Sequence, residues 1–148
     1  MPDFPSVEWL SRRIVESTGD AVLYAGRDGR IRYWNGGAEG IFGWTAAEAV
    51  GQSMDLIIPD RLRGRHWEGW EKSMATGVTR YSGRDLLAVP AQRKDGQSIS
   101  IEFTIQLIRD DAGELVGAAA MVRDVTERFG RDKELRKRLK ELEAQLGK

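Results

Sequence analysis

The sequence predicts one α+β domain, an antiparallel sheet flanked by short helices, from three observations. Residues 98–107 alternate apolar and polar side chains with a period of two, which is typical of a strand with one buried face. Strand-like and helix-like segments come in separate blocks, which favours an antiparallel α+β arrangement. The length of 148 residues, 41% of them hydrophobic, suits a single domain with its own core.

The first block begins with a short helix and continues with a hairpin. Leu10 and Ile14 belong to an apolar stripe at helical spacing and predict a helix over residues 5–17. Residues 21–34 contain two apolar runs on either side of Asp28-Gly29, and this dipeptide between such runs predicts a β-hairpin.

Helices are expected in the middle of the chain. A short one covers about residues 38–42. Thr45 and Glu48 have the spacing of a capping box, which opens a second short helix. The longest helix, roughly 59–76, begins with a proline and ends before Gly77.

Three strands complete the domain, at about residues 79–91, 98–107 and 115–125. The turn sequences Lys94-Asp95-Gly96 and Asp110-Asp111-Ala112-Gly113 separate them. The predicted order is therefore two strands, several short helices and three strands.

The tail from Glu127 is nearly all charged, yet leucines recur in it at spacings of four, three and four, as in the seam of a coiled coil. About three heptads are marginal for an isolated helix. Two interpretations stay open: a helix that pairs with a second copy, which we favour, and a solvated helix that packs on its own domain. The predicted homodimer contacts are Leu135, Leu139, Leu142 and Leu146, with Leu10 and Ile14 of the first helix.

The composition excludes several functions. Lys plus Arg and Asp plus Glu both number 23, and this zero net charge disfavours a nucleic-acid partner or a membrane surface. The absence of cysteine excludes disulfides, thiolate metal sites and a cysteine nucleophile. No signal-peptide pattern is visible, and no apolar run approaches the roughly 18 residues of a membrane span. We therefore expect a cytoplasmic protein.

A set of short motifs, each weak alone but correctly ordered over about residues 10–128, resembles the PAS domain family of sensor modules. The motifs are Asp28-Gly29-Arg30-Ile31, Tyr33-Trp34-Asn35, Ala38-Glu39, Ile41-Phe42-Gly43-Trp44, Glu48 with Gly51, Ile57-Ile58-Pro59, Arg93-Lys94-Asp95-Gly96 and Val122-Arg123-Asp124-Val125-Thr126.

This resemblance implies a five-stranded antiparallel sheet whose concave face and flanking helices enclose a ligand pocket. It implies an N-terminal dimerisation helix over 1–19, a sensor domain over 20–126 and a C-terminal signalling helix over 127–148. Asp124 and Thr126 would couple the last strand to that helix. In bacterial two-component-like proteins of the family the helix acts on an effector such as a histidine kinase, and no effector sequence is recognisable here.

The single histidine suggests what the pocket binds. Leu62, His66, Trp70 and Met74 are four residues apart, so they share one face of the predicted helix 59–76. An imidazole on an apolar face can ligate haem iron. The segment is also similar to the haem-bearing helix of oxygen-sensing PAS kinases, with His66 in register with their proximal ligand. The resemblance therefore implies haem b as a candidate cofactor for gas or redox sensing.

A haem site needs an apolar box, cations for the propionates and a distal group. Leu86 occupies the position of the distal arginine of those kinases. Arg84, two residues earlier, is on the same strand face if the pairing is regular, and two interpretations stay open for it: a side chain that reaches inward or a surface charge. The expected box is Ile57, Leu62, Leu86, Ile105 and Met121, and the expected cations are Arg63, Arg65 or Lys72.

Other interpretations stay open. A histidine on an apolar face is often a core residue, and Trp67 and Trp70 can fill the volume that haem needs. Another small molecule, or no ligand, is therefore an alternative. No nucleophile and base stand together, since Glu68 is two residues from His66 and points elsewhere, so we expect no enzyme activity. The sequence predicts a ligand-binding sensor, and the alternative is a ligand-free dimerisation module with a filled core.

Overall fold

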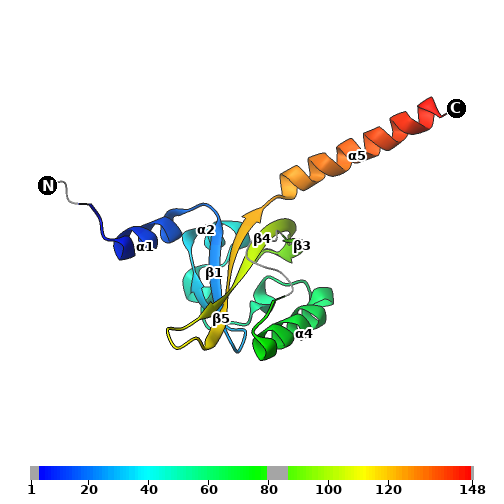
Figure 1. Cartoon of the computed structure of the whole chain (residues 1–148). Coiled ribbons are helices and arrows are strands. Elements are labelled where there is room, and N and C mark those ends of the chain that lie inside the picture. The colour runs from blue at the N-terminus through cyan, green and yellow to red at the C-terminus, as the bar shows by residue number, and fades with distance from the viewer. Residues whose placement is uncertain (1–3, 80–86, 148) are drawn as a thin grey trace.

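The computed structural model describes residues 4–79 and 87–147. Five strands form one antiparallel sheet in the order β2-β1-β5-β4-β3, and the helices between β2 and β3 lie against one of its faces (Figure 1). The strands are β1 (Ala21–Gly26), β2 (Ile31–Trp34), β3 (Leu87–Gln92), β4 (Ser98–Arg109) and β5 (Leu115–Asp124). The helices are α1 (Val7–Ser17), α2 (Gly36–Phe42), α3 (Ala46–Ala49), the 3-10 helix η1 (Met54–Leu56), α4 (Asp60–Thr76) and α5 (Thr126–Leu146). The predicted α+β class, five strands and two terminal helices are confirmed.

The β1–β2 hairpin forms around Asp28-Gly29 as predicted. Gly29 has a φ of 77°, in the left-handed region that favours glycine. A Cβ there would also lie 2.3 Å from the ring of Trp67, so the turn must carry glycine for two independent reasons.

The local helix signals are confirmed with small shifts. α2 begins at Gly36, two residues earlier than expected, because the Asn35 side chain caps it by accepting a hydrogen bond from the Ala38 amide at 2.9 Å. Thr45 and Glu48 form the reciprocal capping box. α4 ends at Gly77, whose φ is 69°.

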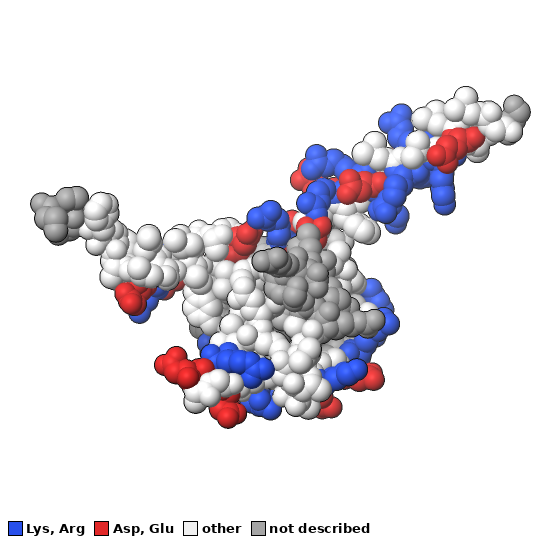
Figure 2. Space-filling view, in the orientation of Figure 1, with Lys and Arg blue, Asp and Glu red and all other residues white. Residues whose placement is uncertain are grey.

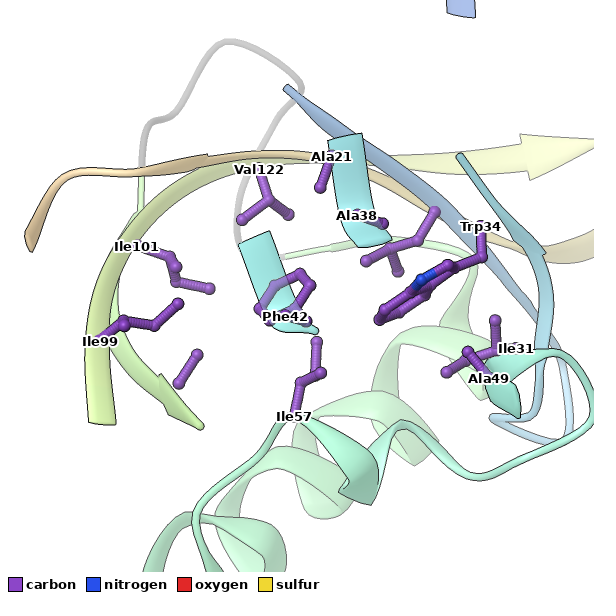
Figure 3. Close-up of a cluster of buried hydrophobic side chains, with 12 residues drawn as sticks. Ala21, Ile31, Trp34, Ala38, Phe42, Ala49, Ile57, Ile99, Ile101 and Val122 are labelled. Carbon is purple, nitrogen blue, oxygen red and sulfur yellow. The ribbon is translucent and has the colours of Figure 1, made fainter. Parts of the chain in front are cut away.

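The inner face of the sheet carries the core. Leu23, Ala120 and Ile105 lie opposite one another on β1, β5 and β4, and their neighbours Val22, Met121 and Thr104 alternate onto the outer face. Apolar side chains of the inner face meet those of the covering helices in one cluster (Figure 3). Its members are Ala21, Leu23, Ile31, Trp34, Ala38, Phe42, Ala49, Ile57, Ala91, Ile99, Ile101 and Val122.

The two terminal helices have no buried residue, and α5 projects away from the sheet (Figure 1). Leu10 and Ile14 of α1 and the four seam leucines of α5 are all exposed. The structure therefore does not show the tail packed on its own domain. Across the described ranges, no helix is both long enough and apolar enough to cross a lipid bilayer.

Candidate functional site

Helix α4 contacts the sheet mainly through its C-terminal half. Met74 is its one fully buried residue in the described chain, and with Trp70 it packs against Leu115, Ala118 and Ile105. The two remaining turns toward the N-terminus, which include His66, are only partly covered.

Two arginines fasten the C-terminal end of α4. The Arg27 guanidinium donates to the carbonyls of Met74 at 3.1 Å and Leu115 at 3.0 Å. Arg109 donates to the Gly77 carbonyl at 3.0 Å. Cations beside the last carbonyls of a helix are favourable, because these carbonyls carry the negative end of its dipole.

His66 lies half-buried between two indole rings. Its ring meets the edge of Trp67 at 4.6 Å between centroids and lies roughly parallel to Trp70 at 6.2 Å. Its Nδ1 is buried and has no hydrogen-bond partner among the residues that the structure describes. Burial lowers the pKa of His66, and the nearby Asp55 carboxylate opposes this only in part. The imidazole is therefore neutral at pH 7.

Both tryptophans are anchored to neighbouring segments. Trp67 donates from Nε1 to Asp55 Oδ1 at 2.6 Å, and Trp70 donates from Nε1 to the Arg27 carbonyl at 3.0 Å. The first bond joins the middle of α4 to η1, and the second joins it to the β1–β2 turn.

The centre of the inner sheet face is incompletely covered. Phe103, Ile105, Leu107 and Ala120 are only half-buried, although β4 and β5 are interior strands of the sheet. Ile101, on the same face, is 5% exposed. The four half-buried residues lie where the main cluster meets the smaller cluster around Met74. An apolar surface of this kind can take a small apolar ligand.

The structure brings together only part of the predicted haem box. Of the predicted site residues, Trp70 and Ile105 both pack against the smaller cluster that contains Met74. Ile57 belongs to the main cluster instead. The prediction for Met121 is wrong, because the strand register places it on the outer face, opposite Val22 and Thr104. Side chains of successive strand residues point to opposite faces of the sheet, and the Met121 side chain points away from the inner face.

The remaining predicted residues differ in how free they are. Leu62 is half-buried on α4. Arg63 is engaged, since it donates to the Ile58 carbonyl at 2.9 Å and the Asp55 carbonyl at 3.0 Å. Arg65 and Lys72 are exposed. The predicted distal residues, Arg84 and Leu86, lie outside the described residues.

An open groove of about 320 Å³ lies elsewhere, between the end of α1 and the glycines Gly36, Gly37 and Gly40 of α2. Residues 16–19 form its other wall. It does not include His66 or the half-buried centre of the sheet, so the groove and the candidate ligand surface are separate features.

The predicted coupling residues form a compact junction. Asp124 Oδ1 accepts from the Thr126 amide at 2.9 Å and from the Thr126 hydroxyl at 2.5 Å. Thr126 Oγ1 in turn accepts from the Ser100 amide at 3.0 Å, and the Val125 amide donates to the Ser100 carbonyl at 2.9 Å. The first turn of α5 is thus fixed to the start of β4.

Sequence reasoning missed the role of Asn35, the chain's one asparagine. It is 3% exposed and uses both amide oxygen lone pairs and both amide hydrogens. The oxygen accepts from the Val22 and Ala38 amides, and the nitrogen donates to the Val15 and Asp20 carbonyls. Its position before Gly-Gly, at a helix start, was the available signal.

A five-stranded sheet with helices over one face defines a small α+β fold of the sensor type. The family model of the PAS fold matches residues 15–129, and the chain belongs to the PAS family. Domains of this family are sensory rather than catalytic.

Three relatives agree with this assignment. A protein of Azorhizobium caulinodans is 34% identical over 123 residues, 82% of this chain and 16% of its own. Sensor protein FixL of Bradyrhizobium diazoefficiens is 27% identical over 135 residues, 91% of this chain and 25% of its own. Oxygen sensor protein DosP of Escherichia coli K12 is 29% identical over 106 residues, 72% of this chain and 13% of its own. The chain therefore spans at most a quarter of the length of these relatives.

Solved structures agree in fold. The PAS domain of a Colwellia psychrerythraea protein has a TM-score of 0.71 at 20% identity, covering 82% of this chain and 99% of that one. An RNA-binding light-oxygen-voltage receptor has a TM-score of 0.72 at 21% identity, covering 95% of this chain and 41% of that one. At such identities the likeness concerns the fold alone.

Proposed function

We propose that this PAS domain senses a small apolar molecule that lies between α4 and the inner face of the sheet. The observation that carries the proposal is the half-buried patch of Phe103, Ile105, Leu107 and Ala120. Covering such a patch with a ligand removes apolar surface from water, at about 25 cal/mol for each Å². The partly covered N-terminal half of α4 gives the ligand a way in.

Haem b is the ligand to test first, with His66 as the axial ligand of its iron. A neutral imidazole is the form that binds a metal, and burial keeps His66 neutral. Within residues 4–79 and 87–147, Nδ1 of His66 has no hydrogen-bond partner, which leaves the ring with hydrogen-bonding capacity for a ligand. Two relatives carry the names of sensor proteins, one of them an oxygen sensor. When bound, haem would supply the gas- or redox-responsive iron.

One observation favours the alternative, a ligand-free dimerisation module. Trp70 lies beside His66 and packs against the same small cluster as Ile105 and Leu107, so part of the volume beside His66 is filled. An indole is large, so little space is left beside it for a flat cofactor.

Absorbance and mass spectrometry of the purified chain decide between these two. A Soret band, before or after titration with haemin, supports the haem proposal if His66→Ala abolishes it and Glu68→Ala, an exposed control on the same helix, does not. A purely tryptophan spectrum after titration, with no small molecule in the mass spectrum, supports the ligand-free module.

We further propose that the signal leaves through two helices of a homodimer and acts on an effector outside these 148 residues. Residues 20–126 would be the sensing unit, and 1–19 and 127–148 the helices that pair. The exposed apolar side chains of α1 and α5 support this, since each helix leaves a seam without a partner in the described chain. The bonds of Thr126 to Asp124 and Ser100 would carry a shift of the sheet into α5.

Two experiments test this route. Leu139→Lys should lower the mass measured by sedimentation equilibrium toward that of a monomer, whereas Ala144→Lys, on the opposite side of α5, should not. The double variant Asp124→Ala with Thr126→Ala should keep ligand binding and uncouple α5. Ligand-dependent changes of helix pairing that survive it would contradict the route.

A further inference from the structure

The outer face of the sheet carries a row of four charged side chains of alternating sign, which we name the charge ladder. One end of the row lies just after α1, and the other lies in the first turn of α5. Figure 2 shows acidic and basic side chains next to one another where α5 leaves the domain. The members are Asp20, Arg123, Glu102 and Arg128.

The two outer steps of the ladder are direct ion pairs, and the middle step joins two residues that face each other across neighbouring strands. Arg123 donates from Nε to Asp20 Oδ1 at 3.2 Å and from Nη2 to Oδ2 at 3.0 Å, the forked geometry of a strong arginine–carboxylate pair. Arg123 of β5 stands directly opposite Glu102 of β4 in the strand register. Glu102 Oε1 accepts from Arg128 Nη2 of α5.

The alternation of strand residues fixes the ladder in place. Phe103 and Val122 take the inner face, so their neighbours Glu102 and Arg123 must face outward. Directly opposite residues of opposite charge stabilise a strand pair. The carboxylate of Glu102 is 19% exposed, against 67% for Arg123 and 52% for Arg128, so it is the member least screened by water.

Hydrogen bonds that involve backbone groups connect one end of the charge ladder to the end of α1 and the other to the start of α5. The Asp20 carbonyl accepts from Asn35, and the Asp20 amide donates to Thr18, the residue that ends α1. At the other end, Thr126 binds Ser100 two residues before Glu102 on the same strand.

We propose that the charge ladder sets the direction of α5 relative to the sheet and couples it to the root of α1, so that a displacement at either helix changes the other. Asp20, Arg123, Glu102 and Arg128 are in this sense positioning residues of the transmission. The inference rests on the proposed function in one respect, because the proposed function assigns signalling to α1 and α5.

The experiment measures the distance between two spin labels on one chain without any ligand. Because the chain has no cysteine, labels can be attached at Ser98→Cys on β4 and Lys140→Cys on α5, with unlabelled chain in excess to remove distances between subunits. Glu102→Gln should raise the population of displaced distances about two- to fivefold, the range expected for losing an exposed pair. The control Arg131→Gln, whose contact is Glu127 on α5 itself, should not.

Asp20→Asn is the decisive variant, because its side chain does not touch α5. We expect Asp20→Asn to raise the population of displaced distances as Glu102→Gln does, but by a smaller factor. This difference from the unchanged chain should disappear near 1 M salt, where the Debye length is about 3 Å. A variant in which all four charges are inverted together should regain the distance distribution of the unchanged chain. A distance distribution that Asp20→Asn leaves unchanged at low salt overturns the coupling, and so does a Glu102→Gln effect no larger than that of Arg131→Gln. Thermal melts verify that each variant is folded. Since no ligand is present, either result leaves the ligand proposal untouched.

Discussion

Replacing Asn35 by aspartate is the sharpest test of how α1 is joined to the domain. The change keeps the shape and the two bonds accepted from the Val22 and Ala38 amides. It removes the donors to the Val15 carbonyl at 2.7 Å and the Asp20 carbonyl at 3.1 Å and places a carboxylate against both. Only side-chain chemistry changes, so any loss of stability comes from these two contacts and from the charge that the variant buries.

The magnitude follows from the burial of the site. A buried acceptor left without a donor costs about 1–3 kcal/mol. Both carbonyls belong to half-buried residues, where water can reach in part, so about 1–2 kcal/mol each is appropriate. A negative charge at the N-terminus of α2 returns less than about 1 kcal/mol. The cost of burying a new charge at this 3% exposed site offsets that return. The expected net loss of about 2–4 kcal/mol is a large part of the roughly 5–15 kcal/mol that stabilises a domain.

Urea unfolding measures this loss directly. At an m-value of about 1–3 kcal/mol/M, Asn35→Asp should lower the midpoint by about 0.7–4 M. The matched control is Gln52→Glu, the same amide-to-acid change on an exposed side chain, and it should leave the midpoint nearly unchanged. Equal midpoints for the two variants would show that water replaces the lost donors and that the four-bond account of Asn35 is mistaken.

Two pH dependences should also be measurable. The hydrogen bond from Lys94, at 2.5 Å, lowers the pKa of Glu48 from 4.5 to about 2. The contribution of this pair to stability is therefore complete above pH 4.5 and is lost as the pH falls toward 2. Lys94→Met should weaken the dependence of the urea midpoint on pH between pH 4.5 and 2, and an unchanged dependence would contradict the pairing. Burial lowers the pKa of His66 below 6.5, so just below that pH the unfolded chain binds more protons than the native chain. Stability should therefore fall as the pH drops below 6.5. The variant His66→Phe should remove this fall. A fall of equal size in His66→Phe would place its origin in other groups.

Much of the fold could be predicted because its signals are local. The Asp28-Gly29 hairpin, the capping box at Thr45 and the end of α4 at Gly77 each depend on a few neighbouring residues. The alternation of residues 98–107 separates an inner from an outer face before any partner strand is known. These features need no knowledge of what lies across the sheet.

The candidate site could be predicted only in part, because it depends on register. The spacing of His66, Trp70 and Met74 predicted a shared face of α4, and in the structure His66 lies beside Trp70, which packs with Ile105 against the cluster of Met74. The same reasoning predicted Met121 in the pocket. In a run of small residues, the neighbouring sequence does not indicate which alternate residues of β5 face inward. One residue of register reverses the face of every side chain.

The sequence by itself determined the order of strands and helices, the single histidine on an apolar helix face and the exposed leucine seam, because periodicity and capping are properties of neighbouring residues. Only the tertiary structure decided that Asn35 joins four segments, that Met121 faces outward and that Asp20 and Arg128 end one row of charges. These contacts join residues up to 103 positions apart, and their distances depend on how five strands align. Alignment is set by the packing of the whole core, which no short window of sequence contains.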